Sequence, residues 1–159
     1  MNTFELVHFL RNDPYVNSVF QGVYPIDRLP REVHYPCAIV VNTDTSEGPG
    51  EHWCCIYISA FKSGVFFNSF GGEPQHWTVR EFLFRHTVKW TFTSVQIQSV
   101  LSKTCGLYCL YFLYQQARGV SVSALLRPFD RLELWRNDIW IRWWFFQARH
   151  VSCRQEIYV

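Results

Sequence analysis

Short apolar runs separated by turn residues predict a small sheet in the first half of the chain. Residues 37–42 (CAIVVN) are apolar and β-branched, which is typical of a buried strand. Residues 53–61 (WCCIYISAF) predict a second strand, and a turn over 62–64 (KSG) joins it to a third strand over 65–68 (VFFN). The segment 43–51 (TDTSEGPGE) is rich in turn residues and predicts the loop between the first two strands.

The hairpin predicted over 53–68 brings two polar side chains together. His52 immediately precedes its first strand, and Asn68 ends its second strand. Because a hairpin places the start of one strand beside the end of the next, we expect His52 and Asn68 to be neighbours.

Helices are predicted around this sheet. The spacing of apolar residues predicts helices over 2–11, 73–86 and 105–117, one or two helices over 122–151, and a further strand over 88–96. Asn2 or Thr3 can cap the first helix, and the proline-containing segment 14–36 predicts an extended arm with one short strand. We therefore expect one α+β domain over 1–159, in which a small, mainly antiparallel sheet packs on a central helix that starts at Cys105.

Composition narrows the class of protein. Hydrophobic residues make up 48% of the 159 positions and charged residues 18%, so the chain can bury a core and is not of the disordered class. We see no signal peptide and no apolar run of transmembrane length, and expect a soluble protein that is not secreted. Arginines interleave with aromatic residues in the last third, where they either contact nucleic acid or, as we favour, form the solvated face of helices: Arg127, Arg131, Arg136, Arg142, Arg149 and Arg154.

The six cysteines do not form a metal-binding pattern. Zinc sites usually show paired knuckles, whereas Cys54 and Cys55 are adjacent and should point to opposite faces of a strand. Cys109 follows Cys105 at helical spacing and is expected to face the core. We expect no metal site, and reduced thiols in a protein that is not secreted.

Cys105 and His52 are the candidate nucleophile and base of a thiol peptidase. Attack of a thiolate on a carbonyl needs a base and donors for the oxyanion. His52 can be the base, and Gln98, seven residues before Cys105, can donate from its side-chain amide. The backbone N–H of Cys105 can be the second donor if a helix starts there, and the positive end of that helix favours a thiolate. Gln96 is an alternative donor, and a buried core cysteine is the alternative for Cys105.

Three segments resemble the adenovirus protease (adenain) and, more distantly, the ubiquitin-like-protein proteases that share its fold. They are CAIVVNTDTSEGPGEHW, FFNSFGG and QSVLSKTCGLYCLYFL. The upstream segment DPYVNSVFQGVYPIDRLP also resembles the N-terminal arm of adenain, so the likeness covers roughly residues 12–118. The resemblance implies a cysteine-proteinase-like fold with a helical C-terminal region. It also implies that His52 is the general base, Cys105 the nucleophile and Gln98 the oxyanion donor.

The resemblance assigns roles to three further residues. Trp53 would line the groove that accepts small residues beside the cut, Gly106 would contribute to substrate binding, and Asn68 would take the place of the acidic triad member. Asn68 departs from the pattern, since that position is usually Asp or Glu, and Glu73 is the alternative source of an acid. An amide can orient a histidine but does not stabilise its protonated form as a carboxylate does.

The function that the resemblance implies is that of a viral cysteine endopeptidase, which cleaves capsid or core precursors at Gly-containing sites during particle maturation. A deubiquitinase or deSUMOylase-type protease of the same fold is the alternative, and a catalytically weak binding module is the third. The implied location is the virion and the host nucleus, and we expect a monomer with no membrane partner.

Adenain-like enzymes also imply activators. Their activating peptide joins by a disulfide through a cysteine that precedes the oxyanion glutamine, but this chain has no cysteine between Cys55 and Cys105. A non-covalent peptide or viral DNA is the activator that the resemblance still allows, and we expect no metal or organic cofactor.

Overall fold

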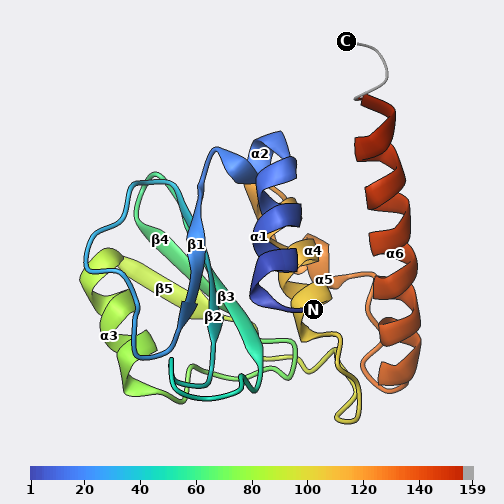
Figure 1. Cartoon of the computed structure of the whole chain (residues 1–159). Coiled ribbons are helices and arrows are strands. Elements are labelled where there is room, and N and C mark those ends of the chain that lie inside the picture. Colours follow the sequence, from blue (N-terminus) through green and yellow to red (C-terminus); the bar gives the residue numbers. More distant parts are fainter. Residues whose placement is uncertain (156–159) are drawn as a thin grey trace.

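A five-stranded sheet lies between α3 on one face and the helices α1, α2 and α4 on the other (Figure 1). The computed structural model describes the backbone of residues 1–155 and the side chains of residues 1–149. Its elements are α1 (Thr3–Asn12), α2 (Pro14–Asn17), β1 (Phe20–Pro25), β2 (Cys37–Asn42), β3 (Trp53–Ile58), β4 (Ser63–Phe67), α3 (Trp77–His86), β5 (Lys89–Phe92), α4 (Cys105–Ala117), α5 (Val122–Leu126) and α6 (Leu134–Gln155).

The sheet is mixed, which differs from the mainly antiparallel sheet that we expected. Its strands follow the order β1-β2-β3-β4-β5, and the two central pairings, β2 with β3 and β3 with β4, are antiparallel. Both edge strands pair in parallel, β1 with β2 and β5 with β4. A parallel pair needs a crossover connection, and the proline-containing arm and α3 supply these two. The hydrophobic pattern predicted the strands but could not show which way each crossover returns.

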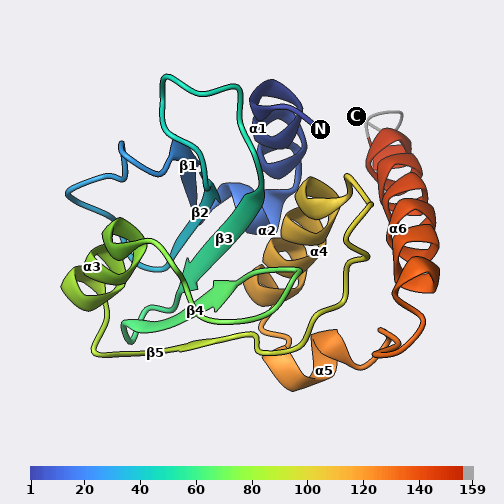
Figure 2. The ribbon, with the colours of Figure 1, turned by 90° about the horizontal axis from the view of Figure 1, so that it is seen from below.

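Alternation along the strands divides the core between the two faces of the sheet. Ala38, Val40, Cys55 and Phe67 pack in the cluster that contains α4, while their neighbours pack against α3. Cys54 and Cys55 therefore face opposite sides, as predicted. Figure 2 shows α4 between the sheet and α6, which makes α4 the central helix that the apolar stretch predicted.

Two predicted boundaries shift for local reasons. The turn between β3 and β4 comes before Ser63, because Lys62 adopts the left-handed conformation (φ 56°) and donates its N–H to the Ser59 carbonyl. The predicted helix over 73–86 begins only at Trp77, since His76 caps it by accepting the N–H of Thr78. The strand predicted over 88–96 ends at Phe92, and α2 forms in the segment 14–36, where only an arm with one strand was predicted. The other elements lie close to their predicted ranges.

Aromatic side chains fasten α6 to α4. The Tyr111 ring meets Phe129, Trp140 and Trp144 edge to face, with ring centroids 5.1–5.4 Å apart. Such pairs contribute about 0.5–1.5 kcal/mol each beyond the area that they bury. The high aromatic content thus joins the C-terminal helix to the core, although Trp135 and Trp143 stay exposed.

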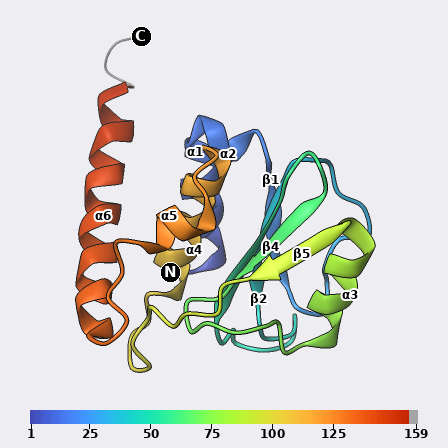
Figure 3. The ribbon, with the colours of Figure 1, turned by 180° about the vertical axis from the view of Figure 1, so that it is seen from behind.

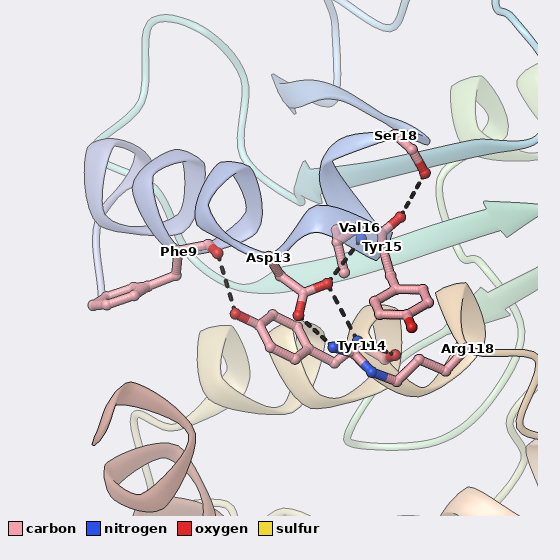
Figure 4. Close-up of polar contacts among 7 residues, drawn as sticks. All are labelled: Phe9, Asp13, Tyr15, Val16, Ser18, Tyr114 and Arg118. Carbon is pink, nitrogen blue, oxygen red and sulfur yellow. Dashed lines mark hydrogen bonds and ion pairs between the residues drawn. The ribbon is translucent and has the colours of Figure 1, made fainter. Parts of the chain in front are cut away.

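An ion pair connects the first turn of α2 to the end of α4 (Figure 4). The carboxylate of Asp13 accepts from both terminal nitrogens of Arg118, at 2.5 and 3.2 Å, and from the N–H of Val16. The Arg118 guanidinium lies over the rings of Tyr15 and Tyr114. Asp13 is 5% exposed, so its charge depends on this arginine.

Replacing Arg118 by leucine should lower the free energy of unfolding by about 2 kcal/mol. Breaking a fully buried pair costs about 3–5 kcal/mol, and the partial exposure of Arg118 reduces that figure. Urea denaturation measures the change. Arg85→Leu, which breaks the exposed pair with Glu81, is the matched control and should cost less than about 1 kcal/mol. Equal losses in the two variants would contradict a structural role for the Asp13 pair.

Candidate active site

A cavity of about 800 Å³ opens where β3 begins and α4 begins, and the predicted site residues gather on its wall. His52, Trp53, Gln98 and Cys105 line it, together with Phe70. These residues come from the start of β3, the loop after β4, and the loop that leads into α4. The structure thus brings together residues that are up to 53 positions apart in the chain.

His52 and Asn68 are hydrogen-bonded, as the hairpin predicted. The Nε2 atom of His52 lies 2.9 Å from Oδ1 of Asn68. That oxygen also accepts the N–H of Phe70 at 3.0 Å, which fixes the amide with its oxygen toward the histidine. Because an amide oxygen can only accept, Nε2 must carry the ring proton, and Nδ1 is the nitrogen with a free lone pair.

The surroundings of His52 favour its neutral form. Burial lowers the pKa of His52 below its usual value, and the hydrogen bond to Asn68 raises it in part. The Phe70 ring stacks on the imidazole with centroids 4.7 Å apart and planes at 25°. Stacking and the Asn68 bond hold the ring in one orientation. Glu73, the alternative acid, lies exposed and pairs with Arg80 instead.

Cys105 differs from the other cysteines whose side chains the structure describes. It is the first residue of α4 and is partly exposed, whereas Cys37, Cys54, Cys55 and Cys109 are buried. Burial raises the pKa of each of those four thiols. The first N–H groups of a helix have no partner within it, so Cys105 lies at the positive end of the α4 dipole. Cys153 lies outside the described side chains.

Gln98 lines the cavity, although only 1% of its surface is exposed. Its Oε1 accepts from the Ser69 hydroxyl at 2.6 Å, and its Nε2 donates to the Ser102 carbonyl at 2.7 Å. These bonds fix which end of the amide is which and leave the second Nε2 hydrogen for a ligand. Gln96 does not line the cavity and instead donates to the backbone carbonyl of Gln98. The geometry therefore favours Gln98 over Gln96.

Of the two residues expected to contact substrate, Trp53 lines the cavity and Gly106 does not. Trp53 lines the cavity, and its indole N–H donates to the Met1 carbonyl at 3.1 Å. Gly106 is buried and is not among the residues of the cavity wall. The Met1 side chain covers it, lying 3.1 Å from where a Cβ on Gly106 would be. Figure 3 shows the N-terminus beside α4. The absence of a side chain at Gly106 makes room for Met1, and substrate binding by Gly106 stays a prediction.

Three residues of this region were not predicted: Ser69, Phe70 and Asp138. Ser69 and Phe70 directly follow Asn68 in the sequence. The predicted position of Asn68 at the end of its strand could therefore have placed them near the site. Asp138 comes from α6 and bonds to the loop before Cys105. Its separation of more than thirty residues from that loop left no local signal.

Two further classes of site find no candidate in the described part of the chain. Among its side chains, no group of three or more His, Cys, Asp or Glu residues is arranged to hold a metal ion. Across the described helices, none combines the length and the apolar character needed to cross a membrane.

Comparisons with known proteins find relatives among viral cysteine proteases, and no protein-family model matches the chain. A protein of African swine fever virus from a Malawi tick isolate, named a cysteine protease, is 32% identical, with 77% of this chain and 50% of that protein aligned. Its counterpart from a Namibian warthog isolate, named a SUMO-1 cysteine protease, has the same 32% identity. The crystal structure of the African swine fever virus protease has a TM-score of 0.63 at 20% identity, over 88% of this chain and 65% of that one.

These similarities establish the fold of the chain. The chain spans about half the length of the curated relatives that it matches. It has the α+β fold of the viral protease, a small mixed sheet with a helical layer on each face. The relative named for SUMO-1 supports the more distant of the two resemblances, to the ubiquitin-like-protein proteases. None of these three comparisons tests the resemblance to adenain.

Proposed function

We propose that this chain is a thiol endopeptidase in which Cys105 is the nucleophile and His52 the general base. The observation that carries the proposal is the oriented pair of His52 and Asn68 on the wall of the cavity that also holds Cys105. A histidine whose Nε2 proton is engaged and whose Nδ1 is free matches the Cys-His-Asn arrangement of papain-like enzymes.

The proposed reaction moves one proton and forms one covalent bond at a time. Nδ1 of His52 takes the proton of the Cys105 thiol, and the thiolate attacks the scissile carbonyl carbon. The oxyanion accepts hydrogen bonds from Gln98 and from the backbone N–H of Cys105. The imidazolium then gives its proton to the leaving amine as the C–N bond breaks. Water, deprotonated by His52, hydrolyses the thioester and restores the thiol.

The proposed substrates carry glycine beside the scissile bond. Trp53 walls the cavity next to His52, and an aromatic wall favours a chain without a side chain at that point. Between the two sources of such a sequence, the relative named a SUMO-1 cysteine protease supports the tail of a ubiquitin-like modifier over a virion precursor. Cleavage of precursor-type sites, as adenain implies, is the second candidate.

A cleavage assay tests both the role of Cys105 and the choice between the two classes of substrate. Purified protein is given a ubiquitin-like modifier extended beyond its Gly-Gly tail, and separately a short Gly-containing peptide, with Cys105→Ala as the inactive control. We expect cleavage after glycine by the wild type and none by the control. Cleavage of the peptide alone would favour the precursor reading, and cleavage by the control would exclude Cys105 as nucleophile.

The same assay includes the two candidate activators, a non-covalent peptide and DNA. Support for DNA is limited to exposed arginines of the last third, namely Arg127, Arg131, Arg136, Arg142 and Arg149, while the side chain of Arg154 lies outside those that the structure describes. Contact with a phosphate backbone would make any stimulation fall steeply with added salt. Stimulation that is independent of salt would argue against binding through these arginines.

Replacing Asn68 by aspartate should raise the rate of Cys105 alkylation by iodoacetamide at pH 6 about fivefold. Burial lowers the pKa of His52, and a carboxylate 2.9 Å from Nε2 would oppose that shift by stabilising the imidazolium. A charged acceptor adds about 1 kcal/mol to this bond. A stabilised imidazolium shifts the neutral thiol–imidazole pair toward the thiolate–imidazolium pair, and the latter then persists to higher pH before the imidazolium deprotonates.

The pH profile of alkylation, followed by peptide mass mapping from pH 5 to 9, measures this change. Glu73→Gln is the control and should leave the profile unchanged, because the Glu73 carboxylate pairs with Arg80. Loss of reactivity in a folded Asn68→Asp variant would show that Asn68 has been assigned the wrong role.

A further inference from the structure

A buried carboxylate from α6 holds the loop between Gln98 and Cys105. Asp138 is 8% exposed, and its Oδ2 accepts from the N–H and the hydroxyl of Ser99, at 3.2 and 2.5 Å. Its Oδ1 accepts from the hydroxyls of Thr104 and Tyr108, at 2.8 and 3.0 Å. Three donors satisfy the carboxylate together with the Tyr108 hydroxyl, whose single proton also lies within reach of the Ile97 carbonyl at 3.1 Å. These bonds offset the cost of burying the charge.

These contacts fall at the two ends of the loop. Ser99 follows Gln98 directly, and Thr104 precedes Cys105 directly. A carboxylate that bonds to both ends fixes the distance between them. Those ends carry the two donors assigned to the oxyanion, the Gln98 amide and the Cys105 N–H.

A chain of hydrogen bonds also joins the carboxylate to the Gln98 amide. Because a carboxylate only accepts, the Thr104 hydroxyl donates to Asp138, and the Ser102 hydroxyl, 2.5 Å from that of Thr104, must donate to Thr104. The Ser102 carbonyl in turn accepts from Gln98 Nε2 at 2.7 Å. Asp138 thus sets the direction of the two hydroxyl bonds, from Ser102 to Thr104 and from Thr104 to Asp138.

We propose that Asp138 is a positioning residue that pre-organises the oxyanion donors of Gln98 and Cys105. The inference rests on the proposed function, because it assigns Asp138 to the step in which the oxyanion forms. Fixed donors stabilise charge that develops in the transition state without reorganising at that moment. Asp138 itself touches no reacting atom, so its effect passes through the loop.

The test compares two reactions of the same thiol. Attack on an amide forms an oxyanion, whereas alkylation by iodoacetamide displaces iodide and forms none. Asp138→Asn places an amide nitrogen among donor groups and should disturb the loop. We expect kcat for the glycine-containing substrate to fall about 10–100-fold with KM changed less than about threefold. The alkylation rate of Cys105 should stay within about twofold of the wild type.

Controls separate positioning from folding. Glu133→Gln removes a carboxylate just before the same helix, where it pairs with Arg136 on the surface, and should change neither reaction. Tyr108→Phe removes one donor to Asp138 and should give a smaller loss of kcat with the same split. It keeps the proposal testable if Asp138→Asn does not fold.

Three results would overturn the inference. Equal losses of cleavage and alkylation would show that Asp138 only stabilises the fold, and wild-type kcat in both the Asp138 and Tyr108 variants would show that it does not act on the loop. Absence of cleavage by the wild type would overturn the proposed function and the role of Asp138 with it. Cleavage by the wild type with an unaffected variant refutes the inference alone.

Discussion

Replacement of His52 by alanine is expected to lower the cleavage rate by at least about a thousandfold. Single members of a nucleophile–base pair act as a unit, and removing one costs about as much as removing both. In the proposed mechanism His52 both deprotonates Cys105 and protonates the leaving amine, so its loss affects two steps. Steady-state cleavage of the glycine-containing substrate measures the effect.

Alkylation gives a second measurement of the same variant that does not depend on substrate. An ordinary cysteine thiol is only about 0.3% ionised at pH 6, and a paired imidazolium raises that fraction. The His52→Ala variant should therefore react with iodoacetamide at pH 6 up to about a hundredfold more slowly than the wild type. His8→Ala, which removes an exposed histidine of α1, is the control and should match the wild type. Unchanged alkylation of Cys105 in His52→Ala would exclude a preformed pair.

Replacement of Gln98 by alanine is expected to lower kcat about 10²–10³-fold, the usual effect of removing one oxyanion donor. Both polar atoms of the Gln98 amide are fixed by Ser69 and Ser102, so its remaining hydrogen is pre-oriented. Alkylation of Cys105 should be unaffected, because no oxyanion forms in that reaction. Gln96→Ala is the matched control, with less than about a threefold change. A large loss in the Gln96 variant and a small one in the Gln98 variant would reverse the assignment.

The losses of kcat caused by Gln98→Ala and by Asp138→Asn should not be independent of each other. If Asp138 acts by holding Gln98 in position, then replacing Asp138 should lower kcat little further once the Gln98 side chain has been removed. The double variant Gln98→Ala with Asp138→Asn is therefore expected to lose less than the product of the two single losses. A full product would mean that Asp138 acts on cleavage by a separate route.

Local patterns predicted the parts of the site that short-range geometry fixes. The strand pattern and a turn sufficed to place His52 beside Asn68, because both belong to one hairpin. The apolar stretch after Cys105 predicted α4 to the residue, since its length and composition leave no other element. In each case one continuous stretch of chain contains the whole signal.

Contacts between segments that are distant in sequence could not be predicted from such local patterns. The parallel pairing of both edge strands depends on where the arm and α3 return, which periodicity does not record. The ion pair of Asp13 with Arg118 and the bonds of Asp138 to the loop join residues that are far apart in sequence. A buried charge shows its partner only when the fold brings the two together.

Asp138 of α6 bonds to the loop before Cys105, so the parts of the site become available in a fixed order during synthesis. During synthesis the chain emerges from its N-terminus, so His52, Asn68, Gln98 and Cys105 all leave the ribosome before Asp138. A nascent chain can then hold His52 and Cys105 while the loop between Gln98 and Cys105 still lacks its bonds to Asp138. In the proposed mechanism, full reactivity toward amide bonds would come only after α6 has docked on α4, so cleavage would begin only once the chain has grown past Asp138.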